Sequence, residues 1–443
     1  MAEDRPEIER CQVGAQRHRD EAYTEKRKKL TRWDESERWS PASLSARSAL
    51  PRSLVYVGGT IDAVTARKMI PTPGAVEEAG ELMMRFAERT GLTSDLPPQR
   101  YLWTDAFAVC NFVGLAQATG EERYTELALR LVDQVHHVLG SYRADDPRTG
   151  WISGLSAQEG EAHPTRGGLR IGKALPERSV SQPFDEQLEW RRDGQYFHYL
   201  TKWMHALDQV YRWTGQSQFN TWARELAKVA HDAFAHTDRS DRRMVWKMST
   251  DLSRPLVSSM GHHDPLDGFI TCTQLGTTKS TQSSTPSGPS LEDEVADFAT
   301  MIAGQDWATA DPLGLGGLLA DAARVAQLMN VGAFAGTDLL DALLAAALRG
   351  LTAYARQGDL THPASRRLPF RELGLAIGLS AVEQIEALAP YVALGSEIKS
   401  FWLEPEHREA RTWSEHRDIN EVMLATSLVP AGFLLMPSAS SPS

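Results

Sequence analysis

The segment from residue 262 to residue 267 holds two histidines and two aspartates within six positions. His262 and His263 are followed directly by Asp264, and Asp267 comes three positions later. Carboxyl groups can transfer protons during the cleavage of a glycosidic bond, and neutral imidazoles can act as bases. Such a density of these groups is unusual for the start of a simple helix. We therefore take His263 and Asp267 as candidate catalytic residues, and His262 and Asp264 as candidate substrate-binding residues.

Five further segments combine acids, aromatic residues, histidine or arginine just before an apolar helical pattern. They are residues 101–105, 191–198, 306–311, 366–372 and 413–417. A carbohydrate site needs this mixture, because aromatic rings stack on the apolar face of a sugar while charged groups bind its oxygen atoms. The candidate substrate-binding residues in these segments are Trp103, Arg192, Tyr196, Arg371, Trp413, Glu415 and His416.

Hydrolysis by two carboxyl groups requires a protonated acid beside the glycosidic oxygen and a second carboxylate. The leading predicted pair is Asp193 with Asp267 or with Asp105, because Asp105 and Asp193 occupy nearly corresponding positions of a sequence repeat. Each has a structural alternative. Asp105 and Asp264 can cap a helix, and Asp193 precedes a glycine and can be a turn residue. The tryptophans can equally belong to the core.

Arginines near these segments favour an anionic sugar such as a uronic acid. These arginines are Arg192, Arg366, Arg367 and Arg371. Arg170 is a further possible substrate contact and lies in the polar stretch 156–189, which is rich in glycine and proline. We predict that this stretch is a loop over the site, since long loops without regular structure are often functional. Surface salt bridges are the alternative role for these arginines.

Two other reactions remain open at this stage. His263 and His416 come from different predicted helices and could act as the two bases of an epimerase or a lyase. The ligand types at residues 262–267 also suit a metal, but their spacing matches no established zinc signature. We expect neither a resident metal nor a cofactor.

A repeat indicates how these residues are positioned. A Thr-Gly pair is followed by an aromatic residue, an alanine and a leucine at the same spacing in two places, which are Thr119, Gly120, Tyr124, Ala128 and Leu131, and then Thr214, Gly215, Phe219, Ala223 and Leu226. One helical hairpin cannot bury its own apolar face, so such a repeat predicts stacked helix pairs.

Apolar periodicity predicts about eleven or twelve helices and almost no strand. The predicted helices cover residues 75–89, 104–118, 122–139, 194–213, 218–235, 291–304, 315–329, 338–356, 371–389 with a break near Ser380, and 415–428, with another that begins near Asp264. Six helical hairpins can close into an all-α (α/α)6 toroid. In that fold the segments leading into the inner helices meet at one mouth.

The hairpin motifs resemble those of the six-hairpin glycosidase-like superfamily. The resemblance covers roughly residues 75–436, and its motifs are structural. It implies an (α/α)6 toroid with a carbohydrate pocket, because the superfamily contains glycoside hydrolases, unsaturated glucuronyl hydrolases, sugar epimerases and lyase domains. No member family's catalytic motif is matched residue for residue, so the reaction has to be argued from side chains.

Composition narrows the class of partner. A net charge of -11 disfavours nucleic acid, which needs a dense basic face. No apolar stretch is long enough to span a membrane, the first residues lack a secretory signal, and three scattered cysteines fit a reducing compartment. We expect a cytoplasmic protein with no nucleic acid or membrane partner, and its oligomeric state is left open.

These observations predict three regions and one principal function. Residues 1–60 form an N-terminal arm that is partly mobile, residues 61–436 the toroid, and residues 437–443 a disordered tail. We expect a carbohydrate-active enzyme, in first place a glycoside hydrolase that acts on a small saccharide through paired carboxyl groups. A non-catalytic helical scaffold that binds a protein is the alternative outside enzymology.

Overall fold

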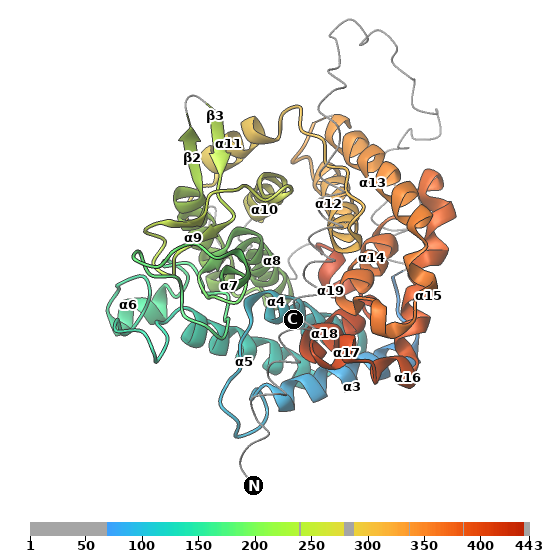
Figure 1. The fold of residues 1–443 in the computed structure, drawn as a ribbon, viewed down its shortest axis with the longest axis horizontal. Coiled ribbons are helices and arrows are strands. Elements are labelled where there is room, and N and C mark those ends of the chain that lie inside the picture. Colours follow the sequence, from blue (N-terminus) through green and yellow to red (C-terminus); the bar gives the residue numbers. More distant parts are fainter. Residues whose placement is uncertain (1–68, 239–240, 279–287, 336, 384, 438–443) are drawn as a thin grey trace, which may run out of the picture. The chain divides into compact units, whose positions relative to one another are not determined.

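Six inner helices follow one another around a closed ring. The computed structural model describes residues 69–437, with gaps at 239–240, 279–287, 336 and 384. The inner helices are α4 (Leu102–Thr119), α8 (Phe197–Thr214), α10 (Asp264–Thr277), α12 (Pro312–Asn330), α14 (Pro369–Ala381) and α18 (Arg417–Leu428). Each contacts the next, and α18 contacts α4, which closes the ring (Figure 1).

An outer helix packs on each inner one. Five outer helices directly follow their partners along the chain and are α5 (Glu122–Leu139), α9 (Ser217–Phe234), α11 (Glu292–Ile302), α13 (Asp338–Gln357) and α15 (Ala389–Leu403). The sixth is α3 (Pro73–Arg89), which precedes the ring in sequence and packs on α18. Arg89 joins these two helices through ion pairs of 2.6 Å to Asp418 and 2.7 Å to Glu421.

Burial explains why one helix of each pair lies inside. In α4 every residue from Leu102 to Ala116 is buried, whereas α5 buries a single face that includes Tyr124, Leu131 and Val135. A helix that is apolar all round has to be surrounded, and an amphipathic helix covers it with its apolar face. The predicted all-α (α/α)6 toroid is confirmed.

Most predicted helices agree with the structure, but the predicted helix 371–389 ends early, at Ala381, and one long helix was missed. The break near Ser380 is present, because α14 ends at Ala381 and the next long helix begins at Ala389. That helix, α15, was not predicted, since apolar residues occur on most of its faces and obscure the period. Short helices occupy the connections and are α6 (Ala157–Ala162), α7 (Glu186–Glu189), α16 (Pro405–Arg408), α17 (Arg411–Ser414), and 3-10 turns at Asp359–Thr361, Ala364–Arg366 and Glu386–Leu388.

The expectation of almost no strand is confirmed, because the described residues contain only five strands of two to four residues each. β1 (Gln195–Tyr196), β4 (Lys247–Met248) and β5 (Pro255–Val257) form an antiparallel sheet in the order β1-β4-β5, with Gln195 opposite Met248. β2 (Ala235–Asp238) and β3 (Asp241–Met244) form a hairpin. Both sheets lie next to the pair of α8 and α9, because β1 directly precedes α8 and β2 directly follows α9. Trp246 lies between β3 and β4.

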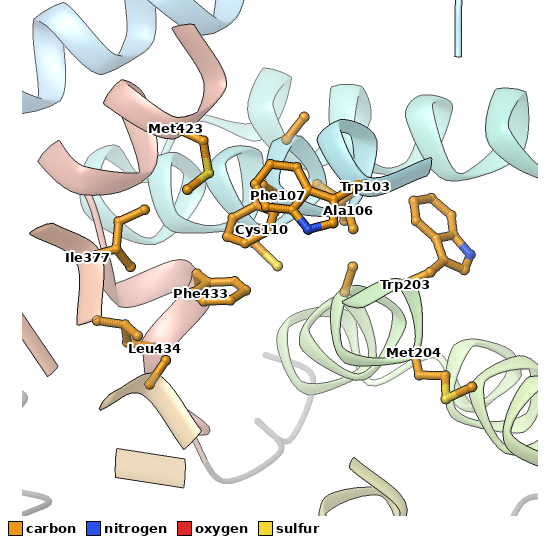
Figure 2. Packing of buried hydrophobic residues seen from close by; sticks show 14 of the residues in the cluster. Trp103, Ala106, Phe107, Cys110, Trp203, Met204, Ile377, Met423, Phe433 and Leu434 are labelled. Atoms are coloured by element: carbon orange, nitrogen blue, oxygen red, sulfur yellow. The ribbon is translucent and has the colours of Figure 1, made fainter. Parts of the chain in front are cut away.

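The C-terminal segment packs into the ring. The helix α19 (Ala431–Leu434) contacts α4, α8 and α12. Its Phe433 ring stacks on Phe107 at a centroid distance of 4.4 Å, and Figure 2 shows it beside Phe107 and near Met423 and Ile377. His205 donates a hydrogen bond of 2.9 Å to the Phe433 carbonyl oxygen, so both the side chain and the backbone hold this segment.

Glycines set the separation of α12 and α14. A Cβ atom at Gly316 would collide with the backbone carbonyl of Gly374, and one at Gly378 would collide with the backbone of Gly316. Because neither helix has a side chain at these points, the two backbones approach directly. This brings residues of α12 and α14 to one wall of the cavity described below.

The predicted N-terminal arm lies outside the described residues, as do all but the first residue of the predicted tail. Every described residue belongs to one compact unit, which spans Ser53–Ser443. Among the described helices, none combines the length and the apolar character that a bilayer crossing requires.

Candidate active site

A cavity of about 380 Å³ lies among the N-terminal ends of the inner helices. The first turns of α4, α8, α10 and α12, with the segments that precede α10 and α12, supply most of its lining, and α14 and α18 add residues from their interiors. The volume falls within the range of roughly 300–1,000 Å³ that is usual for small-ligand pockets. Four of the six inner helices thus bring their starting segments together at this cavity, whereas α14 and α18 reach it only with residues from their interiors.

The start of α10 contributes the predicted cluster as a whole. His262, His263, Asp264 and Asp267 all line the cavity. The helix begins at Asp264, and Pro265 is tolerated there because the first turn needs no backbone donor. Carboxyl groups in a first turn are also favoured by the positive end of the helix dipole.

Asp264 is a buried carboxyl group without a full set of partners. Asp264 is 4% exposed, and its Oδ2 atom has no hydrogen-bond partner among the described residues. Burial, together with the nearby charge of Asp267, raises the pKa of Asp264 to about 8. At neutral pH this carboxyl group therefore carries a proton that it can donate.

Asp267, one turn further along the same helix, is held in the opposite state. Lys202 on α8 donates a hydrogen bond of 2.7 Å to its Oδ1 atom. Burial opposes ionisation, but the charge and hydrogen bond of Lys202 outweigh it and hold the pKa of Asp267 below its ordinary value. The cavity therefore contains one protonated and one ionised carboxyl group from a single helical turn.

A third carboxyl group, Asp321, comes from the interior of α12. It lines the cavity and is 4% exposed, and Arg324 donates to it over 3.2 Å. Burial is the main cause that raises the pKa of Asp321 to about 6, and the negative charge of Asp267 is the second. Sequence reasoning missed Asp321, Arg324 and Lys202, because it examined only the segments before the helices. The signal available was an aspartate and an arginine three positions apart inside an apolar helix.

Neutral histidines complete the polar lining. His198 on α8 lies with its Nδ1 atom 3.7 Å from Asp264, and burial lowers the pKa of His198 to about 4. His263 donates a hydrogen bond of 3.0 Å from Nε2 to the Trp307 carbonyl oxygen. The pKa of His263 is lowered, mainly by burial and to a smaller extent by the neighbouring His262. Both imidazoles are thus uncharged at neutral pH and can accept a proton.

Aromatic side chains form the apolar part of the lining. Trp103, which was predicted, lies at the cavity with Phe107, Phe433 and Trp246. Sequence reasoning did not identify Trp246, which follows the strand β3 rather than leading into a helix. Tyr196 was predicted to bind substrate, but it lies behind this wall, where its ring stacks on Trp246 at 4.9 Å. Trp246, which is half-buried, lines the cavity in the place of Tyr196.

The predicted pairing of Asp193 with Asp267 is not formed. Asp193 is fully buried outside the cavity lining, where it accepts hydrogen bonds of 2.6 Å from Arg170 and 3.0 Å from the Gly172 backbone. Arg170 also donates to the carbonyl oxygens of Ser141 and Val138, so its guanidinium is fully occupied. Both side chains fasten the long loop to the start of β1.

Asp105 is also absent from the cavity lining. Its carboxylate accepts a hydrogen bond of 2.8 Å from the Tyr101 backbone and lies 3.4 Å from Arg100. Burial raises the pKa of Asp105 to about 6. The side chain thus supports the start of α4, which is the structural alternative considered for it.

The two remaining predicted arginines point elsewhere. Arg192 donates to Gln182 at 2.6 Å. Arg371 pairs with Asp311 at 2.5 Å, and Asp311 in turn caps α12 through a hydrogen bond of 2.9 Å from the Gly314 backbone. Asp311 lines the cavity but Arg371 does not, so this arginine acts on the site only through its partner.

The last helix start contributes none of its predicted residues to the cavity. Trp413 is buried against Trp402, with ring centroids 5.7 Å apart. Glu415 pairs with Arg411, and His416 is exposed. The cavity touches α18 through Met423, in the middle of that helix, so the segment before it lies beyond reach. His263 and His416 are therefore not brought together.

Comparison with known proteins gives a likeness of fold. No protein-family model matches the chain, and no curated protein matches it in sequence. Among solved structures, the GH76 α-mannanase of Bacteroides thetaiotaomicron is 8% identical, with a TM-score of 0.50 over 80% of this chain and 96% of that one. A sugar epimerase from a ruminal bacterium is 10% identical, with a TM-score of 0.48 over 81% and 99% of the two chains.

A cellobiose 2-epimerase from Spirochaeta thermophila is also similar, at 12% identity and a TM-score of 0.44 over 75% of this chain and 86% of that one. Identities this low show shared architecture rather than shared chemistry. The closed ring of six helix pairs and the likeness to the α-mannanase, at a TM-score of 0.50, show that this chain has an (α/α)6 toroid fold.

Proposed function

We propose that the protein is a carbohydrate-active enzyme that hydrolyses a glycosidic bond in the cavity at the start of α10. Asp264 is the general acid, and Asp267 is the second carboxylate. The observation that carries this proposal is the contrast between two buried cavity carboxyl groups three positions apart: Asp264 has an oxygen without a partner, and Asp267 accepts a hydrogen bond of 2.7 Å from Lys202. The raised pKa of Asp264 and the lowered pKa of Asp267 agree with this contrast. Such a divided pair is what glycoside hydrolysis requires.

Each carboxyl group has a separate task in this mechanism. The proton of Asp264 passes to the glycosidic oxygen as the bond to the sugar carbon breaks, so that the leaving group departs as an alcohol. Asp267 completes the reaction in one of two ways. It accepts a proton from the water whose oxygen bonds to the sugar carbon, or it attacks that carbon itself to form a glycosyl ester, which water then hydrolyses while the Asp264 carboxylate accepts the proton of the water. Lys202 keeps Asp267 ionised through its hydrogen bond of 2.7 Å.

The cavity favours a neutral saccharide. Its two cationic side chains are Lys202 and Arg324, and each already pairs with a carboxylate of the cavity. The expectation of an anionic sugar rested on Arg192, Arg366, Arg367 and Arg371, with Arg170 as a possible contact from the loop, and all five lie outside the lining. Trp103 and Trp246 supply ring faces on which the apolar side of a sugar can stack.

A substrate panel with matched variants tests the proposal. Aryl glycosides of neutral hexoses, including α-mannosides, are compared with aryl glucuronides and unsaturated uronides by release of the aryl group or loss of the uronide absorbance. We expect turnover of a neutral glycoside, and a loss of about 10²–10⁴-fold in kcat for Asp264→Asn. The matched control is Asp311→Asn, which changes another cavity carboxyl group. Turnover by Asp264→Asn equal to the wild type would contradict the assignment.

Epimerisation is the second candidate, because three imidazoles line the same cavity. His198 and His263 replace the predicted pair of His263 and His416, since both face the cavity and burial keeps both neutral. A base that removes a proton from a sugar carbon needs this state. Incubation of free mono- and disaccharides in deuterated water distinguishes the two reactions. Deuterium at a sugar carbon without bond cleavage supports epimerisation, and cleavage without exchange supports hydrolysis.

A further inference from the structure

A second cluster of ligand-type side chains lies outside the cavity, between the outer helices α9 and α11. It consists of His231 and Asp232 near the end of α9 and Glu294 at the start of α11. A ring nitrogen of His231 and one carboxylate oxygen from each acid lie within 4.8 Å of one another. None of these residues takes part in the proposed hydrolysis.

Two buried atoms of the cluster have no partner. His231 is 8% exposed and Glu294 is 3% exposed, yet His231 Nδ1 and Glu294 Oε2 form no hydrogen bond with the described residues. The nearest acidic oxygen to Nδ1 belongs to Asp232 at 3.6 Å, which is too long for a hydrogen bond. Buried polar atoms are normally satisfied, so this pair requires an explanation.

The other nitrogen of His231 determines which tautomer is present. His231 Nε2 donates a hydrogen bond of 2.6 Å to Asp297, and Arg242 holds the same carboxylate at 2.8 Å. A neutral ring with its proton on Nε2 directs the Nδ1 lone pair toward the two acidic side chains. Lone pairs and carboxylates repel one another unless a cation lies between them. A carboxylate behind a histidine is also the usual support for a metal-bound imidazole.

We propose that His231, Asp232 and Glu294 bind a divalent transition metal of the zinc type. One imidazole and two carboxylates are ligands that zinc accepts, and a water molecule would complete four-coordination. Bonds of about 2.0–2.1 Å place tetrahedral ligands roughly 3.3 Å apart, so the cluster must contract on binding. The Asp232 side chain is 75% exposed and free to rotate, which allows this contraction and gives the ion a path from solvent.

The neighbouring charges limit the affinity without excluding the site. Lys228 donates to Glu294 Oε1 at 2.7 Å and therefore leaves Oε2 available. Lys228 and Arg242 contribute two positive charges, and Asp232, Glu294 and Asp297 contribute three negative ones. The helix α10 packs against both α9 and α11, so an ion joining the outer helices would brace the helix that carries Asp264 and Asp267.

Zinc titration of the chelator-treated full chain tests this site. Calorimetry counts the sites and measures their affinity in the wild type, in Asp232→Ala and in Glu294→Gln, with circular dichroism to confirm folding. We expect both variants to lose one site or to bind at it at least tenfold more weakly, and zinc to raise the melting temperature of the wild type more than that of either variant. Asp297→Asn, which removes the support of the imidazole, should weaken binding about 10–100-fold.

The matched control is Asp133→Ala. Asp133 is an exposed aspartate beside His137 on α5, but both ring nitrogens of His137 already have partners at 2.9 Å, in the Asp133 carbonyl oxygen and Glu161. This variant should bind zinc like the wild type. The proposal is overturned if Asp232→Ala keeps every site at full affinity. It is also overturned if the only zinc bound is lost in a variant of His262 and His263, or if titration shows His231 doubly protonated at neutral pH and indifferent to zinc.

Discussion

Lys202 on α8 donates a hydrogen bond of 2.7 Å to Asp267 on α10, so one inner helix sets the ionisation of a carboxyl group on the next. The resulting negative charge also acts on Asp264, because it adds to burial in raising the pKa of that group to about 8. A single contact between neighbouring helices thus contributes to both protonation states that the proposed reaction needs.

The pH dependence of kcat/KM should follow these two groups. Activity requires protonated Asp264, so it should fall as the pH rises through about 8. Activity also requires ionised Asp267, whose pKa lies below its ordinary value of 3.8, so the acidic limb should lie below that pH. Rates measured from pH 3 to pH 10 on a turned-over glycoside check both limbs. An acidic limb near pH 6 would instead identify Asp321 as the second carboxylate, since its pKa is about 6.

Lys202→Met should move the acidic limb upward. Without the ammonium group, burial is opposed mainly by the charge of Arg324, so the pKa of Asp267 rises and the carboxylate is lost at a higher pH. We expect a displacement of about one pH unit or more, which is a rate loss of roughly tenfold on the acidic side of the optimum. Lys202→Arg keeps the charge and is the control. An unshifted profile in the methionine variant would show that Lys202 has no influence on Asp267.

Stability should respond to pH in opposite directions at the two carboxyl groups. Asp264 has a raised folded pKa, so its contribution is fully present below pH 3.8 and is lost as the pH rises through about 8. Asp267 has a lowered folded pKa, so its contribution is present above pH 3.8 and is lost on further acidification. Asp264→Asn should therefore melt at a higher temperature than the wild type at pH 9. A melting temperature at pH 9 below that of the wild type would contradict the burial of an unpaired carboxylate.

Asp193→Asn should lower stability rather than abolish turnover. The substitution leaves the buried Arg170 guanidinium without a charged partner, and breaking one side of such a pair destabilises a protein by about 3–5 kcal/mol. Urea denaturation measures this loss, and activity per folded molecule should remain. Asp145→Asn, in an exposed pair with Arg143, is the control and should change stability by under about 1 kcal/mol. Complete inactivation with unchanged stability would restore the catalytic role that we expected from the sequence.

Two adjacent glycines on α12 should respond in opposite ways to alanine. Gly316→Ala forces a methyl group against the α14 backbone, and overpacking of this kind destabilises by about 1–3 kcal/mol. Gly317→Ala meets nothing within 4 Å and should stabilise by about 0.5–1 kcal/mol, because alanine favours the helix. Thermal melts of the two variants provide the comparison. Equal effects at both positions would mean that the close approach of α12 and α14 is not maintained in solution.

Much of the fold could be predicted from the sequence, because local sequence patterns specify most of its helices. Apolar periodicity and the Thr-Gly hairpin motif located most of the long helices, and each predicted starting segment does precede an inner helix. Residues 262–267 were also recognisable, since four functional groups gather within one turn. The packing of α3 on α18 was not visible, because it joins segments more than 300 positions apart.

Within the site, the sequence by itself determined which residue types stand at the helix starts, and only the tertiary structure decided which of them share a cavity. Asp193 and Asp267 looked equivalent because both are acids near the start of a helix. In the structure Arg170 pairs with Asp193 outside the cavity, whereas Lys202 donates a hydrogen bond to Asp267 inside it. Asp321 came from the middle of a helix, where no local rule pointed to it. The reason is physical: the charge state of a carboxyl group depends on burial and on partners from other helices, and neither is encoded in its immediate neighbours along the chain.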